Sequence, residues 1–333
     1  MKILITGIAG FVGSTIAREL INNGHKISGV DNFSYGYPER IKDIQNKINF
    51  YESDLNNFNL NDDIDLIINC AAIAPLPNNQ ESHSSSLINN VATCGSITDL
   101  CLKNGIKKII HFSSSAVYEN GPSKEGGLAS EKDILNPKLM YPVSKYLSEE
   151  YFKTQSSMYG LDVFCLRLFN LYGPRQDYFR KQPPLIGYLL ESVIRNKEIT
   201  LYASENAKRD YIYIDDLMSL LNIIINDKTH QGFFAFNVGS GKSYSVYDIL
   251  NVLEEITKKE INFKKGQPKT FWNNFPSIFN SKIPLPFEAL VNEVNKNASS
   301  DISFTKKLFN WEPEIGMKEG LYECLNYAKD IIK

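Results

Sequence analysis

The stretch KILITGIAGFVG, residues 2–13, decides the fold of this chain. Residues 2–6 form an apolar run with the length of a buried strand, and residues 11–23 place apolar side chains at helical spacing before Gly24. Between them stand three glycines, which permit a sharp turn, a close approach of the backbone to a ligand and tight packing of helix on strand. The sequence therefore predicts a strand, a glycine turn and a helix whose N-terminus binds a pyrophosphate.

A second strand predicted at residues 26–30 ends in Asp31 and Asn32. An acidic side chain at this place accepts hydrogen bonds from the ribose hydroxyls of a dinucleotide and repels a 2′-phosphate. No arginine stands nearby to favour that phosphate. We therefore expect NAD as the cofactor, in preference to NADP.

The length and charge of the chain limit its class. Its 333 residues suffice for one large or two medium domains, and the formal net charge of −2 argues against nucleic-acid binding by bulk electrostatics. No apolar run approaches the about 18 residues of a membrane span. The chain also enters its first strand at once, so we expect neither a membrane segment nor a signal peptide.

The cysteines and histidines bear on the cellular compartment and on metal binding. The five cysteines are odd in number, lack a Cys-x-x-Cys pair and mostly fall in apolar segments. We therefore expect buried free thiols and a reducing cytoplasm. The four histidines show no metal-ligand spacing, so we expect no catalytic metal.

Strands and helices alternate through the first half of the chain. Further strands are predicted at residues 48–51, 65–70, 108–112 and 163–168, and helices at 87–102 and 141–159. Repeated β–α units with apolar strands predict an α/β fold: a doubly wound parallel sheet of Rossmann type, covered on both faces, with a smaller C-terminal α/β substrate domain.

The periodicity weakens after Asn170, which sets the expected domain boundaries. We predict an NAD-binding domain over residues 1–169, to which a segment of about 211–238 returns. Residues 170–210 and 239–333 are expected to form the nucleotide-sugar-binding domain. The aromatic and Pro-rich stretch 263–300 carries no clear pattern of secondary structure.

Tyr141 and Lys145 form the only Tyr-x-x-x-Lys pair of the chain. On a helix, residues four apart share one face, so the ammonium lies beside the phenol and lowers its pKa. Ser113, Ser114 and Ser115 end the preceding predicted strand and place a hydroxyl nearby. A phenolate, an ammonium and a hydroxyl at this site would remove the proton from a carbinol while its hydride passes to NAD.

Together, the Gly-x-x-Gly-x-x-Gly turn and the Tyr-x-x-x-Lys helix resemble the extended branch of the short-chain dehydrogenase/reductase family, which modifies nucleotide sugars. Three further segments are similar to motifs of that family: Asn90-Val91, the strand at 166–175, and Arg209 to Asp216. The resemblance implies Ser114, anchored by Val117-Tyr118, as the catalytic hydroxyl, with Ser115 as the alternative.

The resemblance also assigns binding residues. Cofactor contacts are expected from Gly7, Gly10, Phe11, Val12, Gly13, Asp31, Asn32, Asp54, Leu55, Ala71, Ala72, Tyr141 and Lys145. Substrate contacts are expected from Ser115, from Asn170, from Tyr202 stacking on a base, and from Arg209 holding the pyrophosphate with its bidentate fork.

Ser115 and Ala116 bear on the reaction. Dehydratases of the resembled family carry Asp-Glu at this place, and neither residue here can act as a carboxyl acid or base. The small uncharged pair is typical of the 4-epimerases, so we predict an NAD-dependent nucleotide-sugar 4-epimerase. A nucleotide-sugar dehydrogenase or reductase remains the alternative, with a dehydratase or a non-catalytic NAD-binding scaffold less favoured. Base and sugar stay open, and the resemblance implies a homodimer built on helices 87–102 and 141–159, in carbohydrate metabolism and polysaccharide biosynthesis.

Overall fold

The computed structural model describes residues 1–119, 127–180, 182–278 and 285–332. The chain divides into two compact units. Unit 1 comprises Met1–Glu119, Leu135–Leu168 and Met218–Phe236, and unit 2 comprises Asn120–Ile134, Phe169–Leu217 and Asn237–Lys333. The predicted catalytic residues all fall in unit 1.

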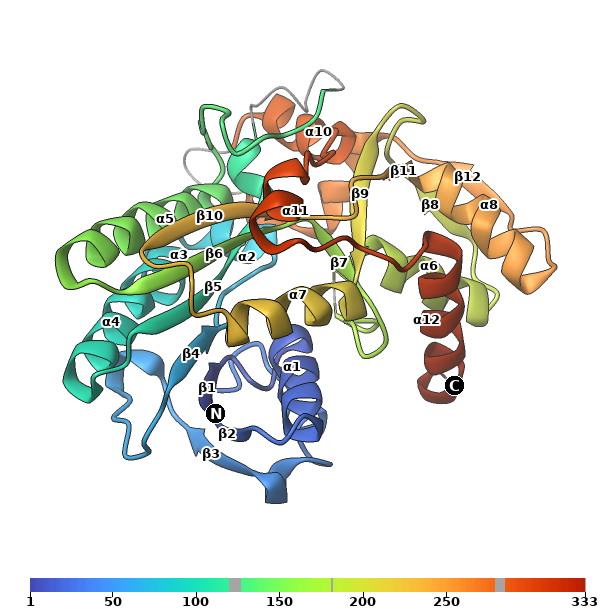
Figure 1. The fold of residues 1–333 in the computed structure, drawn as a ribbon. Coiled ribbons are helices and arrows are strands. Elements are labelled where there is room, and N and C mark those ends of the chain that lie inside the picture. The colour runs from blue at the N-terminus through green and yellow to red at the C-terminus, as the bar shows by residue number, and fades with distance from the viewer. Residues whose placement is uncertain (120–126, 181, 279–284, 333) are drawn as a thin grey trace. The chain divides into compact units, whose positions relative to one another are not determined.

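Unit 1 is built around a seven-stranded sheet in the order β10-β6-β5-β4-β1-β2-β3 (Figure 1). Its strands are β1 (Lys2–Thr6), β2 (Lys26–Asp31), β3 (Ile48–Glu52), β4 (Leu66–Asn69), β5 (Lys108–Ser114), β6 (Asp162–Leu168) and β10 (Phe233–Val238). The strands from β1 to β6 pair in parallel throughout. The chain winds outward from β1 in one direction and from β4 in the other, so the predicted doubly wound sheet is confirmed.

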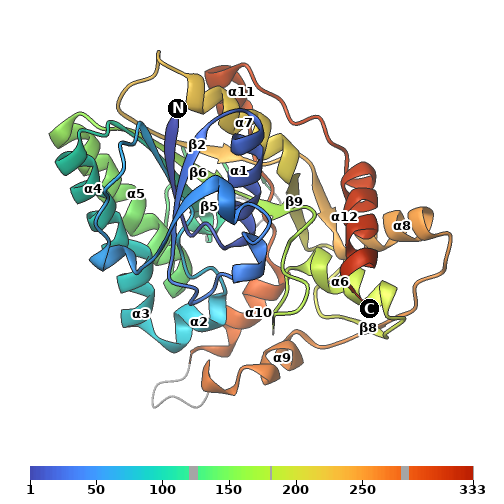
Figure 2. The same ribbon diagram turned by 90° about the horizontal axis from the view of Figure 1, so that it is seen from below.

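Helices cover both faces of this sheet. They are α1 (Phe11–Asn22), α2 (Leu76–Glu81), α3 (His83–Leu87), η4 (Ile88–Ala92), α4 (Thr93–Asn104) and α5 (Met140–Tyr159), with short turns η1 (Pro38–Arg40), η2 (Gln45–Lys47), η3 (Leu55–Asn57) and η5 (Ser115–Tyr118). Helix α7 (Ile214–Asn226) begins in unit 2 and ends in unit 1. In Figure 2, α4 and α5 lie side by side on one face of the sheet and α1 lies on the other.

The predicted helix over residues 87–102 is interrupted. It is α3 ending at Leu87, one π-helical turn η4, and α4 beginning at Thr93. The wide turn carries Asn90, a buried side chain that hydrogen-bonds to residues outside the helix. Single π-turns of this kind mark functional sites in other helices.

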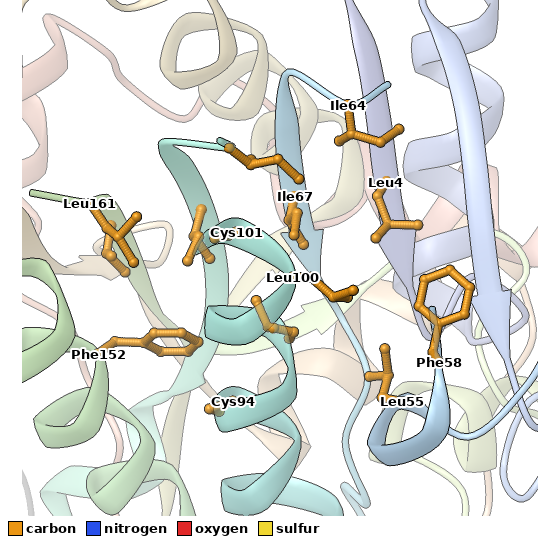
Figure 3. Packing of buried hydrophobic residues seen from close by; sticks show 14 of the residues in the cluster. Leu4, Leu55, Phe58, Ile64, Ile67, Cys94, Leu100, Cys101, Phe152 and Leu161 are labelled. Carbon is orange, nitrogen blue, oxygen red and sulfur yellow. The ribbon is translucent and has the colours of Figure 1, made fainter. Parts of the chain in front are cut away.

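The core of unit 1 fills the space between the sheet and the α4–α5 face. Leu4 and Ile67 from the strands meet Leu100 of α4 and Phe152 of α5, all fully or almost fully buried (Figure 3). Helices α4 and α5 end at Asn104 and Tyr159, because Gly105 and Gly160 adopt the left-handed conformation that caps a helix. Four of the five cysteines are buried and all are free, which confirms the expected buried thiols.

Unit 2 holds two small sheets. One has the order β11-β9-β7 and the other pairs β12 with β8. Its elements are β7 (Asn170–Tyr172), α6 (Leu185–Ile194), β8 (Ile199–Leu201), β9 (Lys208–Tyr213), β11 (Ser243–Ser245), α8 (Val246–Thr257), β12 (Phe263–Lys265), α9 (Pro268–Phe271), η7 (Trp272–Asn274), η8 (Pro276–Ile278), α10 (Phe287–Asn295), α11 (Ser303–Phe309) and α12 (Met317–Ile331).

The expected return of residues 211–238 to the first domain is wrong at its start. Only β10 joins the seven-stranded sheet, whereas β9 pairs with β7 and β11 in unit 2. The apolar pattern of β9 predicts a strand correctly but cannot choose its partner. In the structure, residues 170–172 of β7 pair in parallel with residues 211–213 of β9.

Residues 263–300, for which the sequence gives no pattern, contain short elements. Trp272 is almost fully buried and packs edge-to-face on Phe271 and against Phe275. Aromatic packing therefore organises this part of unit 2 in place of long periodic helices. No helix in the described part of the chain is long and apolar enough to cross a membrane.

A buried ion pair joins α5 to the sheet. Arg167 of β6 donates to both carboxylate oxygens of Glu149, and the closest N–O distance is 2.8 Å. Ser113 of β5 also donates to Glu149, and Arg167 donates to the Tyr118 hydroxyl at 2.8 Å. The pair thus fixes the end of β5 and the turn after it.

Glu149→Gln should lower the free energy of unfolding by about 3–5 kcal/mol, because it leaves the buried Arg167 without its counter-charge. Glu255→Gln, in the exposed pair with Lys318, should change it little, because solvent screens an exposed ion pair. Urea unfolding followed by circular dichroism measures both. Equal effects of the two substitutions would contradict this account of the buried pair.

Candidate active site

The glycine turn after β1 leaves no room for side chains. Gly7 has φ +65°, and a Cβ there would lie 2.8 Å from the backbone of Ala71. A Cβ on Gly13 would lie 2.4 Å from the carbonyl oxygen of Gly7, and one on Gly10 would lie 3.2 Å from the same atom. Gly7 and Gly13 are therefore required by backbone packing, as their places in the sequence predict, and a side chain at Gly10 would make a tight contact.

Helix α1 begins directly at this turn. Its N-cap is Gly10, and no side chain caps the first turn. The uncapped backbone N–H groups of residues such as Phe11 and Val12 present donors and a partial positive charge to an anion. A glycine cradle leading into an uncapped helix fits the pyrophosphate of a dinucleotide.

Asp31 ends β2 beside the turn. One of its carboxylate oxygens accepts the N–H of Ala9 at 2.9 Å and the other that of Phe33 at 2.8 Å. Burial raises the pKa of Asp31, although these hydrogen bonds oppose the shift. The carboxylate is thus held in one orientation at the strand end, with lone pairs left for ribose hydroxyls.

Other expected cofactor residues take varied positions. Asn32 donates to Asp54 at 2.9 Å, and Asp54 in turn caps the short helix that contains Leu55. The Leu55 side chain belongs to the core of unit 1. Ala71 and Ala72 follow β4 and are half-buried, as small residues at a strand exit should be beside a flat ligand. Their roles remain predictions.

Lys145 is buried inside unit 1, with 3% of its surface exposed. Its ammonium donates to the carbonyl oxygen of Phe112 in β5 at 2.7 Å. Burial lowers the pKa of Lys145 to about 8, against an ordinary value of 10.5. The ammonium is therefore held at a fixed place, and burial disfavours its charged form.

Tyr141 lies one helical turn before Lys145 in α5 and is half-buried. Ser114 ends β5, and its Oγ accepts the N–H of Ala116 at 3.1 Å, which leaves the hydroxyl proton outside that bond. Ser115 begins η5 and is also half-buried. The structure thus places the predicted acid–base pair and both serines in unit 1, on α5 and at the carboxyl end of β5.

Asn90 holds the start of α5. Its Nδ2 donates to Ser144 Oγ at 3.0 Å, and Ser144 Oγ donates to the carbonyl oxygen of Tyr141 at 2.8 Å. The amide of Asn90 also accepts the N–H of Ile73, at 2.7 Å, in the loop after β4. The π-turn of η4 therefore serves to bring this amide between the loop and the helix.

The family of the chain follows from a comparison with known proteins. Residues 3–239 match the NAD dependent epimerase/dehydratase family. The chain belongs to this family.

Relatives and solved structures of the family span nearly the whole chain. A putative UDP-glucose 4-epimerase of Methanocaldococcus jannaschii is 29% identical over 98% of each chain. The UDP-glucose 4-epimerase of Thermotoga maritima, solved with UDP-glucose, has a TM-score of 0.84 at 25% identity over 100% of each chain. The UDP-glucuronic acid 4-epimerase of Bacillus cereus, solved with UDP-glucuronic acid and NAD, has a TM-score of 0.83 at 25% identity, covering 99% of this chain and 100% of the other.

These findings confirm the predicted family, fold and enzyme class, and NAD as the cofactor. The structure adds that Gly7, Gly13 and Asp31 fit the dinucleotide by their packing and hydrogen bonds.

Three of the expected substrate residues lie in unit 2: Asn170, Tyr202 and Arg209. Arg209 donates from Nη2 to the carbonyl oxygens of Glu293 and Val294, at 2.9 and 3.2 Å. Asn170 donates to the carbonyl oxygen of Asp210 at 2.8 Å. The two bonds of Arg209 use only one of its nitrogens, so the guanidinium is oriented while its other donors lie outside these bonds.

Tyr202 lies against Gly266 and Phe271. Its ring packs edge-to-face on Phe271 with centroids 5.4 Å apart. A Cβ on Gly266 would lie 2.6 Å from the same ring, so the glycine makes room for it. Tyr202 is half-buried, and its stacking on a nucleotide base stays a prediction.

Sequence reasoning missed Glu149 and its partners. Glu149 stands four residues after Lys145 on α5, and it accepts from Ser113 beside the predicted catalytic Ser114. The four-residue spacing from the lysine was the available signal, but an acidic residue on a helix is usually exposed. The burial of Glu149 depends on its ion pair with Arg167, which lies on β6 and is distant in the sequence.

The difference in free energy of unfolding between wild type and Lys145→Met should depend on pH, and it should be most favourable to the variant near neutral pH. The folded-state pKa of about 8 lies below the ordinary 10.5, so the unfolded chain binds this proton more tightly between those values. Wild-type stability therefore gains on that of the variant as pH rises from about 8 to about 10.5. Urea unfolding of both proteins across this range measures the difference, and a constant difference would contradict the buried charge.

Proposed function

We propose that this protein is an NAD-dependent 4-epimerase of nucleotide sugars, with UDP-sugars as its substrates. The observation that carries the proposal is the buried Lys145 ammonium one helical turn from Tyr141. It supplies the positive charge that a phenol needs in order to ionise near neutral pH. The UDP-sugars named in the similar 4-epimerases support the choice of nucleotide.

In this proposal each residue has one role. Tyr141 takes the proton of the sugar C4 hydroxyl and later returns it to the C4 oxygen, after the hydride has come back to the opposite face of C4. Lys145 stabilises the tyrosinate, and Ser114 donates its hydroxyl proton to the C4 oxygen and holds it in place. When bound, NAD supplies a reversible acceptor for the C4 hydride.

The turn after β5 supports epimerisation over dehydration. Ser115 and Ala116 begin η5 directly after Ser114, and neither carries a carboxyl group. A dehydratase needs an acid to protonate its leaving hydroxyl and a base to remove a second carbon-bound proton. Epimerisation needs only the hydride step and rotation of the keto sugar before the hydride returns.

Unit 2 would bind the nucleotide. Arg209 would hold the pyrophosphate through the donors that its backbone contacts leave outside, and Tyr202 would stack on the base. Asn170 and Ser115 would contact the sugar. The proposed cofactor contacts thus lie in unit 1, and the proposed contacts to the nucleotide lie in unit 2.

The purified protein should interconvert at least one pair among UDP-glucose, UDP-N-acetylglucosamine, UDP-glucuronate and their 4-epimers. Tyr141→Phe should lower kcat by at least about 100-fold, because it removes the acid–base group, and should leave NAD binding intact. Nuclear magnetic resonance of the sugar protons measures the conversion. No interconversion by protein with verified bound NAD would contradict the proposal, and stoichiometric release of NADH would instead identify a dehydrogenase.

We also propose a homodimer formed by the surface of α4 and α5 that points away from the sheet. Two apolar side chains of α5 are exposed, Leu147 at 39% and Met158 at 65%. They are eleven residues apart, which places them on one helical face. Ile88 of η4 and Leu102 of α4 are also exposed, at 53% and 43%. A pair of such helices from each of two copies would cover this surface.

Met158→Glu should convert the dimer into a monomer, because it places a charge within the apolar face. Tyr322→Glu is the matched control, since Tyr322 is 51% exposed on α12 of unit 2. Sedimentation velocity measures the mass of each variant. A wild-type protein that is monomeric at micromolar concentration would overturn the proposed dimer.

The cytoplasm is the proposed place of action. The buried thiols form no disulfide, which suits a reducing compartment. The proposed reaction would belong to carbohydrate metabolism, in the supply of nucleotide sugars for polysaccharide biosynthesis.

A further inference from the structure

A chain of buried hydrogen bonds runs through unit 1 from β1 to helix α5. Its members have at most half-exposed side chains, and four of them are almost fully buried polar residues that the proposed reaction does not use. In order, the chain joins Ala71, Thr6, Asn69, His111, Ser148 and the backbone of Lys145.

The distances are those of well-formed hydrogen bonds. Thr6 Oγ1 donates to Asn69 Oδ1 at 2.7 Å, and Asn69 Nδ2 lies 2.9 Å from His111 Nδ1. His111 Nε2 lies 3.0 Å from Ser148 Oγ. Ser148 Oγ donates to the carbonyl oxygen of Lys145 at 2.7 Å.

Only one direction satisfies every member. The hydroxyl of Thr6 accepts the N–H of Ala71 at 3.3 Å and donates to Asn69, whose Nδ2 therefore faces His111. The imidazole must then accept at Nδ1 and carry its proton on Nε2, from which it donates to Ser148. Reversing the chain would leave the Lys145 carbonyl without this donor.

His111 is held as a neutral ring in this arrangement. It is fully enclosed, and burial together with the nearby Lys145 charge keeps its pKa well below the ordinary value. Phe152, one turn after Ser148 on α5, packs against the imidazole with ring centroids 5.0 Å apart. A neutral, packed imidazole with both nitrogens bonded is a rigid connector between strand and helix.

Both ends of the chain lie in the candidate active site. Thr6 directly precedes Gly7 of the glycine turn, and Ala71 follows β4 at the expected cofactor contact. At the other end, Lys145 is held twice by β5: its ammonium bonds Phe112, and its helical turn bonds His111 through Ser148.

We propose that Asn69, His111 and Ser148 are positioning residues, which fix Lys145 and thereby Tyr141 relative to the cofactor-binding ends of β1 and β4. The inference deepens the proposed function and rests on it for the role of Lys145. Displacements of reacting groups of about 1 Å by distant substitutions cost up to about 100-fold in rate, so a rigid brace here has a measurable effect.

The first test compares two buried serines of the same helix. Ser148→Ala removes the link between His111 and the Lys145 turn, whereas Ser156→Ala removes a hydrogen bond of equal length, 2.7 Å, to the Leu161 carbonyl near the end of α5. We expect Ser148→Ala to lower kcat for epimerisation about 10-fold with KM unchanged. Ser156→Ala should leave kcat within about twofold of wild type.

A second readout needs no substrate. The absorbance of tyrosinate, measured as the difference between each protein and its Tyr141→Phe counterpart, reports the pKa of Tyr141 alone. Ser148→Ala and His111→Phe should raise this pKa, because Lys145 is no longer held beside the phenol. Ser156→Ala should leave the pKa of Tyr141 unchanged. A loss of global stability alone should not change this pKa either.

Conservative replacement of the histidine completes the test. His111→Gln retains a side-chain amide that can donate toward Ser148, so it should restore part of the kcat that His111→Phe loses. Should Ser148→Ala and His111→Phe keep the wild-type kcat and Tyr141 titration, or should Ser156→Ala match their losses, the brace would be overturned. Absence of epimerisation by wild type contradicts the proposed function instead, and the titration then still decides the inference.

Discussion

The burial of one charge, the ammonium of Lys145, is the constraint on which the rest of this site depends. A lysine inside a core is costly unless its charge is paired or hydrogen-bonded. Here a single backbone carbonyl of β5 takes the ammonium, at a place set by the parallel pairing of β5 with β4 and β6. The wound sheet therefore fixes where the positive charge sits, and α5 then places Tyr141 one turn away.

Around that charge, α5 is secured by polar side chains on several sides. Ser144 is held by Asn90 of the π-turn, Ser148 by His111 of β5, and Glu149 by Arg167 of β6. Apolar packing of Phe152 alone would not set the rotation of the helix this narrowly, because apolar contacts are non-directional. Hydrogen bonds are directional and therefore fix the rotation of the helix. Removal of any one partner leaves a buried polar group unsatisfied, which lowers the stability.

Much of the fold could be predicted from residues that are close in the sequence. The glycine turn, the helix stops at Gly105 and Gly160, and the Tyr141–Lys145 spacing depend only on local backbone and helical geometry. What could not be predicted depends on register between distant strands. The partner of β9 and the alignment of Asn69 with His111 follow from strand pairing, which a lone histidine or a single apolar strand does not encode.

The proposed reaction requires that hydride leaves sugar C4 and returns to the same carbon without exchange. The most direct measurement is epimerisation of a nucleotide sugar carrying deuterium at C4, followed by mass spectrometry and nuclear magnetic resonance of the product. Full retention of deuterium at C4 in both epimers is the predicted result. Loss of deuterium to solvent would instead show removal of a carbon-bound proton, and would contradict the roles assigned to Tyr141 and Lys145.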